Sequence, residues 1–170
     1  GFQTEEAMQD FRALGLLYPL RYDDLSPAKV RMVKQIIHWS TLRNLVGLCF
    51  MLPCSPHVLR QIITASTGWD ISILEMQEAA ERAYDMAREF NRRCGQTAAD
   101  DAPPRRFFEP MGNGPIAGDA IDPVAFAGAL RLYYDMVGWD HETGAPHDWK
   151  LHALGLDWIV EQRRAEAAGQ

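Results

Sequence analysis

The chain has 170 residues, of which 47% are hydrophobic and 24% are charged, and its formal net charge is −6. The length is enough for one domain with a real core, and the acidic balance argues against a general nucleic-acid binder, which needs a basic face. No apolar run approaches the roughly 20 residues of a membrane span, and no signal peptide opens the sequence. We therefore expect a cytoplasmic protein without nucleic-acid or membrane partners.

The cysteines and the first residue add two expectations. Three cysteines do not form a disulfide framework, and we expect reduced thiols. The chain begins with Gly1 instead of methionine, which we interpret as a remnant of tag cleavage.

Three helix starts are marked by a capping residue followed by proline, a residue that is tolerated in the first turn because it needs no N–H partner there. They are Ser26-Pro27, Ser55-Pro56 and Asp122-Pro123. The first predicted helix runs to about Arg43, the second stops near Gly68 and the third ends at Gly138. The apolar face of the first helix is predicted at Val30, Val33, Ile36, Ile37 and Ser40.

The clearest helical pattern begins at Ser72, which forms a capping box with Glu75. Apolar residues with a period close to 3.6 follow at Ile73, Met76, Ala80, Ala83, Ala87 and Phe90, and Gly95 provides the stop. We also expect an N-terminal helix across Thr4 to Leu14, a short helix from Trp149 to Leu154 and a last one near Leu156 to Ala167.

Between these helices, residues 96–121 contain four prolines and three glycines and are predicted to form a long irregular loop. No segment shows the period of two expected of strands. The predicted fold is therefore all-α, a single domain over residues 1–170 with six or seven helices, and residues 162–170 are expected to fray.

Most of the polar motifs have ordinary structural interpretations. Gly112 and Gly114 do not follow a strand, so a turn is favoured over a phosphate cradle. His141, His147 and His152 match no compact zinc spacing and are expected in turns and on the surface. We assign no catalytic residue in this chain.

Two cysteines lie in an apolar run, NLVGLCFMLPC, at Cys49 and Cys54. Four ligands are needed for a tetrahedral zinc site or a four-iron cluster, and this spacing of five has no second pair. From the residues alone, small buried core cysteines are favoured over metal ligands. Gly47 favours a ligand-binding segment instead, because a glycine two residues before Cys49 lets the backbone approach a ligand closely.

Five segments, taken in order between about Lys29 and Leu156, resemble those of a known enzyme family. They are NLVGLC (44–49), TGWDISILEMQEAAERAYDMAREFNRRCG (67–95), PPRRFFEP (103–110), LYYDMVGWDHETGAP (132–146) and LHALGL (151–156). They are similar to segments of the C-terminal all-α domain of the tungsten-pterin aldehyde:ferredoxin oxidoreductase family. The family's versions include D-x-x-G-L-C, T-G-W-D, P-x-R-F-x-E-P and Y-Y-x-x-x-G-W-D-x-x-T-G-x-P.

The resemblance implies a cofactor role for the first segment. In the family, three cysteines of an upstream Cys–x–x–Cys–x–x–x–Cys run and the cysteine of D-x-x-G-L-C hold a 4Fe-4S cluster, so Cys49 is implied as a metal ligand. The same segment contacts a pterin of the tungsten (or molybdenum) bis-pterin, which implies Asn44, Gly47 and Leu48 as cofactor-binding residues. Asn44 replaces the family's aspartate, and an amide carries no charge and also donates hydrogen bonds.

The implied parent enzyme oxidises a small aldehyde to a carboxylic acid and passes electrons to ferredoxin. Its upstream pterin-binding and cluster-binding domains are the implied partners. The isolated chain is expected to be inactive, without cofactors, and to carry Cys49 as a free thiol on an apolar docking face with Ile36, Ile37, Phe50 and Met51. The alternative is a non-catalytic helical binding module, or a split-enzyme subunit that keeps the fold without cofactors.

Overall fold

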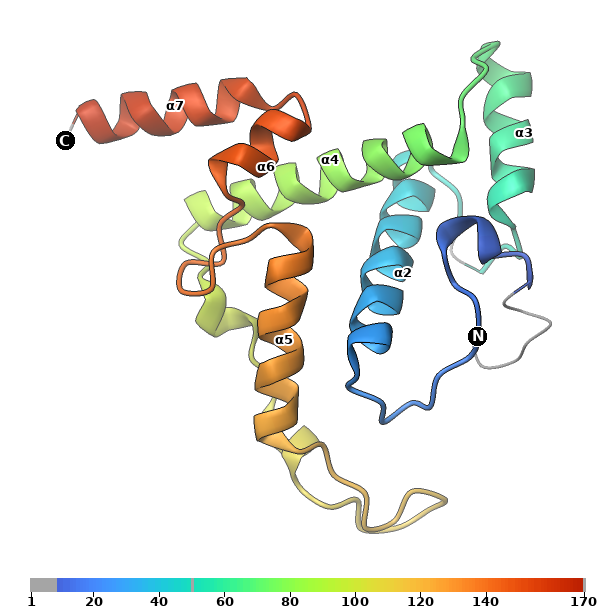
Figure 1. Ribbon diagram of the computed structural model, residues 1–170, viewed down its shortest axis with the longest axis vertical. Helices are drawn as coiled ribbons and strands as arrows, with labels where there is room; N and C mark the ends of the chain where they lie inside the picture. The colour runs from blue at the N-terminus through green and yellow to red at the C-terminus, as the bar shows by residue number, and fades with distance from the viewer. Residues whose placement is uncertain (1–8, 50, 170) are drawn as a thin grey trace.

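The computed structural model describes residues 9–49 and 51–169. The regular elements of these residues are helices, joined by turns and loops (Figure 1). The α-helices are α2 (Pro27–Leu45), α3 (Pro56–Thr67), α4 (Ile73–Arg93), α5 (Pro123–Val137), α6 (Asp148–Ala153) and α7 (Asp157–Ala168). Short 3-10 helices are η1 (Arg12–Leu14), η2 (Ala98–Asp101) and η3 (Arg105–Phe108). The described residues contain no strand, only an isolated bridge between Trp139 and Pro146. The all-α prediction is confirmed.

Local capping chemistry sets the helix starts where the sequence predicted them. The side chains of Ser26 and Ser55 accept hydrogen bonds from backbone N–H groups in the first turns of α2 and α3. Asp122 caps α5 in the same way, and Ser72 forms the full capping box with Glu75 at the start of α4. Each cap satisfies N–H groups that have no intrahelical partner. The four helix starts are therefore marked by local hydrogen bonds, which can be recognised without knowing the tertiary contacts.

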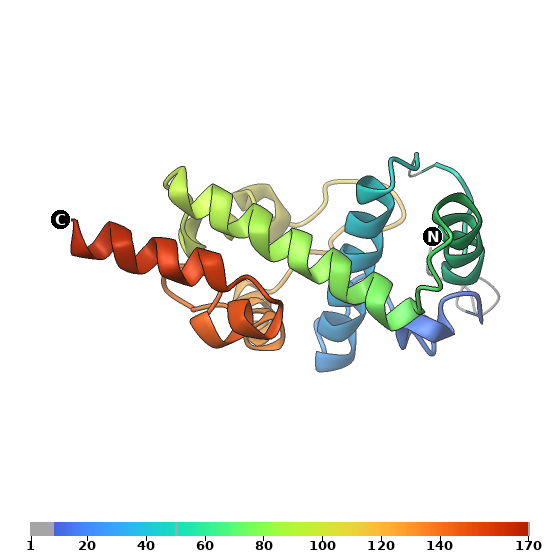
Figure 2. The same cartoon turned by 90° about the horizontal axis from the view of Figure 1, so that it is seen from above.

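Helix α4 is the longest element and lies against most of the others. Both α2 and α3 pack on it, α2 also packs on α5, and α6 packs on α7 (Figure 1). Seen from above, α7 lies beside the C-terminal half of α4 (Figure 2). Here Arg93 donates hydrogen bonds to Gln162 at 2.9 Å and Glu166 at 2.5 Å.

Three apolar clusters make up the interior. The first joins α2, α3, the start of α4 and the N-terminal segment, with Leu59 and Ala80 fully buried. The second joins α2 to α5 around Trp139, and the third joins α6 to α7 around Leu151. None of the described helices combines the length and apolar character needed to cross a membrane.

The predicted apolar face of α2 is only partly correct. Val30 is buried, but Val33 is 37% exposed, Ser40 is exposed, and Ile36 and Ile37 are half-buried. The buried side chains are Val30, Met32, His38, Trp39 and Leu42. The reason is that α2 contributes to two different apolar clusters and therefore buries more than one face.

The second half of α4 also departs from the predicted pattern. Phe90 is 65% exposed and Ala87 is exposed, whereas Asp85, Arg88 and Glu89 are buried. Each of these charged side chains has a strong partner, so its burial does not leave an uncompensated charge. The apolar period therefore locates the buried face of α4 only in its first half.

The partners of the buried charges come from distant parts of the chain. Trp139 donates its indole N–H to Asp85 at 2.5 Å. The guanidinium of Arg88 binds both carboxylate oxygens of Asp101, at 3.0 and 2.7 Å, and the Gly144 carbonyl at 2.7 Å. These bonds connect α4 to η2 and to the turn that follows α5.

A further polar group lies between α2, α4 and α6. The carboxylate of Glu81 accepts hydrogen bonds from Lys150 at 2.5 Å and pairs with Lys34 at 3.3 Å. Nearby His38 is 2% exposed, and its ring lies 6.1 Å from that of Tyr84. Burial lowers the pKa of His38 to about 4, while Glu81 acts in the opposite direction and Lys34 and Lys150 reinforce the lowering.

The loop at 96–121 and the two ends of the chain follow the sequence-based predictions only in part. Residues 96–121 form the expected long loop, but it contains η2 and η3, and its tip is closed by a 3.0 Å bond from the Met111 N–H to the Asp119 carbonyl. Residues 162–168, expected to fray, form the last turns of α7, held by the Arg93 contacts. The expected N-terminal helix across 4–14 falls partly outside the described residues, and η1 covers its end.

Truncating the fully buried Leu59 tests the first apolar cluster. We expect Leu59→Ala to lower the free energy of unfolding by about 2–5 kcal/mol, because it removes buried methyl groups and leaves a cavity. Urea denaturation is the measurement. Val58→Ala, one residue earlier and 45% exposed, is the matched control and should change the value by less than about 0.5 kcal/mol. Equal losses in the two variants would contradict this packing.

The buried imidazole of His38 predicts a loss of stability in acid. Its folded pKa lies below the unfolded value, so between about pH 6.5 and about 4 only the unfolded chain takes up a proton there. The contribution of His38 to the free energy of unfolding is fully present above about pH 6.5 and is lost as the pH falls toward about 4. The wild-type chain should therefore lose on the order of 3 kcal/mol relative to His38→Gln across this window.

The measurement is denaturant unfolding at several pH values, with the exposed His57→Gln variant as the control. The free energies of unfolding of wild type and His38→Gln are compared at each pH, because the pH dependence that Asp85 contributes has the opposite sign. Burial raises the pKa of Asp85 to about 6, so its protonation stabilises the folded chain as the pH falls. Parallel pH curves for wild type and His38→Gln would contradict the expected burial.

Candidate functional site

The four residues implied in cofactor binding lie together where α2 ends. The helix stops at Leu45, and Gly47 has a left-handed backbone with φ of 71°. The Gly47 N–H donates to the Asn44 carbonyl at 3.1 Å, and the Leu48 N–H donates to the Arg43 carbonyl at 2.9 Å. This pattern satisfies the carbonyl groups of the last helical turn and reverses the chain.

Glycine is required at position 47 by this conformation, since an L side chain at such a φ is strained. A Cβ placed on Gly47 would meet no atom within 4 Å, so the space beside the backbone is open. The approach of a cofactor to this backbone, which the resemblance implies, stays a prediction.

The turn after Gly47 is held by Arg43, from the last turn of α2. Its Nη2 donates to the Cys49 carbonyl at 2.5 Å and to the Leu52 carbonyl at 2.8 Å. The Leu52 N–H also donates to the Cys49 carbonyl, at 3.0 Å. The Arg43 side chain thus binds the carbonyl of Cys49 and that of Leu52, three residues later.

The three cysteines are free thiols in different surroundings. Cys49 is exposed, which overturns the interpretation from the residues alone that it is a buried core residue. Cys54 is half-buried against the first apolar cluster, and burial raises the pKa of its thiol. Cys94 is exposed at the end of α4. Cys49 and Cys94 are both exposed, and each lies near a glycine with a left-handed backbone, Gly47 and Gly95, so the resemblance and not the exposure distinguishes Cys49.

The surface around Cys49 is unusually apolar. Leu45 is 53% exposed, Met51 is 74% exposed and Leu52 is 45% exposed. Ile36 and Ile37 were expected on this face but are half-buried against the first and second clusters. Phe50 lies outside the described residues. Exposed apolar residues so close in sequence are typical of a surface that another part of a protein covers.

Asn44 and Leu48 differ in their exposure. The side chain of Asn44 is exposed and has no hydrogen-bond partner among residues 9–49 and 51–169, so its carbonyl and amide groups are available to a ligand. Leu48 is half-buried and packs on the first apolar cluster, which anchors the segment. Its N–H is already used in the helix end.

The described part of the chain gathers no three His, Cys, Asp or Glu side chains that could hold a metal. His141 pairs with Asp135 at 2.8 Å and His152 pairs with Asp157 at 2.6 Å. His147 stacks on Trp149. The role of Cys49 as one ligand of a metal cluster therefore rests on the resemblance and stays a prediction.

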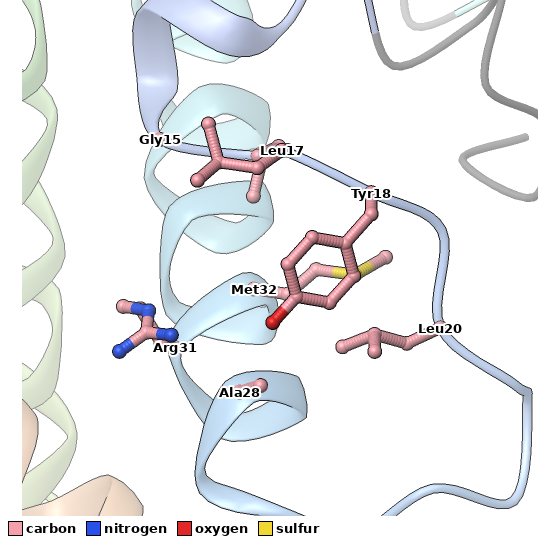
Figure 3. A pocket seen from close by; sticks show the side chains of 8 residues that line it. Gly15, Leu17, Tyr18, Leu20, Ala28, Arg31 and Met32 are labelled. Atoms are coloured by element: carbon pink, nitrogen blue, oxygen red, sulfur yellow. The ribbon is translucent and has the colours of Figure 1, made fainter.

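Sequence reasoning overlooked Arg43, because a guanidinium that binds carbonyl groups six and nine residues later leaves no recognisable pattern. A separate pocket of about 140 Å³ lies between residues 15–20 and α2, with Tyr18 over Met32 (Figure 3). Its lining includes none of the four implied residues.

Comparison with known proteins identifies the family of this chain. The family model described as "Aldehyde ferredoxin oxidoreductase, domains 2 & 3" matches residues 3–156. The chain is 31% identical to the tungsten-containing aldehyde ferredoxin oxidoreductase of Pyrococcus abyssi, over 94% of this chain and 26% of the relative. It is 32% identical to that of Thermococcus kodakarensis, over 84% of this chain and 24% of the relative. The chain thus spans about a quarter of the length of these curated relatives.

A solved structure shares the fold. It is described as "Active site complex BamBC of Benzoyl Coenzyme A reductase in complex with 1,5 Dienoyl-CoA". The TM-score is 0.64 at 23% identity, over 82% of this chain and 21% of that one. The likeness supports the arrangement of helices alone. The family model matches residues 3–156, which is most of the chain. The chain therefore belongs to the aldehyde ferredoxin oxidoreductase family.

Proposed function

We propose that this chain is the C-terminal all-α part of an oxidoreductase similar to aldehyde ferredoxin oxidoreductase. In this proposal Cys49 provides the fourth thiolate of a 4Fe-4S cluster, and Asn44, Gly47 and Leu48 contact a pterin. The observation that carries the proposal is the exposed Cys49 thiol on a fixed turn beside the open backbone of Gly47.

When bound, a tungsten (or molybdenum) bis-pterin would supply the two-electron oxidation of a small aldehyde with water to the carboxylic acid, and a cluster would supply the route for the two electrons to ferredoxin. The chain's own residues bind and orient. The Cys49 thiolate binds iron, Asn44 presents its amide, and the Gly47 backbone admits the pterin closely. We assign no proton-transfer role to any residue of this chain.

The rest of the enzyme is the proposed partner of this surface. The relatives are about four times as long as the matched region, and a cluster needs three more thiolates. Large apolar side chains are exposed elsewhere as well, such as Trp69 at 66% and Leu74 at 69%. These surfaces support a chain that packs against pterin-binding and cluster-binding domains, and we propose that the isolated 170 residues bind neither iron nor tungsten.

Removing Cys49 in the intact enzyme that carries this chain tests the ligand assignment. We expect Cys49→Ala to lose most of the iron per polypeptide and the thiolate-to-iron absorbance, because a thiolate ligand is missing. Cys54→Ala and Cys94→Ala are matched controls and should retain the iron. A Cys49→Ala enzyme with a full, spectrally normal cluster would sink the proposal, and would favour a helical module that keeps the fold without a cofactor role.

Substituting Asn44 tests the pterin contact separately. We expect Asn44→Ala to lower the pterin released per polypeptide while leaving iron unchanged, because its amide contacts the pterin and not the cluster. Ser40→Ala, at an exposed position one turn earlier on α2, is the control. Unchanged pterin content and unchanged pterin affinity in Asn44→Ala would remove Asn44 from the site.

A further inference from the structure

We propose that Arg43 is the positioning residue of the Cys49 ligand, and that its guanidinium, bonded to the Cys49 carbonyl, is a cation close to the cluster that Cys49 would hold. This inference rests on the proposed function and adds to it a residue that the family motif does not contain. The evidence lies in three contacts and one unbalanced charge.

The contacts surround Cys49 from both directions along the chain. The Arg43 carbonyl accepts the Leu48 N–H at 2.9 Å, immediately before Cys49. The guanidinium reaches past it to the Leu52 carbonyl at 2.8 Å, immediately after the turn, and binds the Cys49 carbonyl itself at 2.5 Å. One residue thus fixes the backbone of the proposed ligand from its own main chain and its own side chain. A ligand whose backbone is fixed in advance binds without the cost of ordering a flexible loop.

The charge of Arg43 has no carboxylate within ion-pair distance in the described part of the chain. The other half-buried or buried arginines on α4 and α7 do have such partners: Arg88 pairs with Asp101, and both Arg92 and Arg163 pair with Glu89. In addition, the Nε atom of Arg43 is buried and has no hydrogen-bond partner among the described residues. A partly buried cation of this kind is stabilised when an anion arrives beside it.

A four-iron cluster held by four thiolates is an anion, and it gains a further negative charge on reduction. A guanidinium beside one of its ligands stabilises the reduced form more than the oxidised form, since the attraction grows with the charge. Arg43 should therefore raise the reduction potential of the cluster as well as hold Cys49 in place. A residue that acted only by holding the turn would change the iron content but would leave the potential of the remaining clusters near that of wild type.

The test uses the intact enzyme that carries this chain, with Arg43→Gln, Arg43→Lys and a control, Arg31→Gln. Arg31 is exposed on the same helix and makes no contact with the turn, so its substitution removes the same charge at a distance. The readouts are iron per polypeptide and the midpoint potential from a redox titration followed by electron paramagnetic resonance. Circular dichroism reports whether each variant is folded.

We expect Arg43→Gln to bind less iron than wild type and its remaining clusters to titrate at a more negative potential. Arg43→Lys should keep a potential near that of wild type but lose part of the iron, because an ammonium does not reproduce the fork of the guanidinium. Arg31→Gln should match wild type in both readouts. If Arg43→Gln does not fold, Arg43→Lys carries the test, and wild-type iron content in it overturns the positioning role.

Wild-type iron content and wild-type potential in Arg43→Gln would overturn the inference. A midpoint potential in Arg43→Lys that is as negative as that of Arg43→Gln would overturn the charge effect. The two proposals fail separately. A full cluster in Cys49→Ala refutes the ligand assignment whatever the Arg43 variants do. Loss of the cluster in Cys49→Ala with wild-type behaviour in Arg43→Gln refutes only the role of Arg43.

Discussion

The carboxylate of Glu81 on α4 connects α2 to α6 through two ion pairs. It lies between Lys34 of α2 and Lys150 of α6, at 3.3 and 2.5 Å. Because these three charges are largely shielded from water, their attraction is stronger than at an exposed surface, and the loss of one would leave the others unbalanced. Together with the apolar contacts of Met32, Trp39 and Leu42 with Met76 and Ala80, the pairing places α2 on α4, and α2 leads into the segment 44–52.

The proposed site follows from how α2 ends. A left-handed glycine stops the helix, the Arg43 side chain holds the reversed chain, and Cys49 is left exposed on a short turn. The segment exposes the apolar side chains of Leu45, Met51 and Leu52, which suits the proposed surface covered by another domain.

The sequence predicted the helices well because the signals are local. Ser26, Ser55, Ser72 and Asp122 cap helices through groups three residues away or fewer, and Gly68 and Gly138 end them by their own backbone preference. The buried charges of α4 were not predictable in this way. The partners of Asp85 and Arg88 lie 54 and 13 residues away, and a charged residue in the sequence carries no sign of such a partner.

The site was predictable to a similar degree. The motif around Cys49 could be found by resemblance, and the exposed thiol agrees with it, but the apolar run alone suggested a buried residue. Arg43 stayed hidden because its role depends on the path of the turn. The most direct measurement is the structure of the intact, metal-loaded enzyme with iron located by anomalous scattering. The account predicts an iron atom bonded to the Cys49 sulfur, and a cluster held by four cysteines all outside this chain would contradict it.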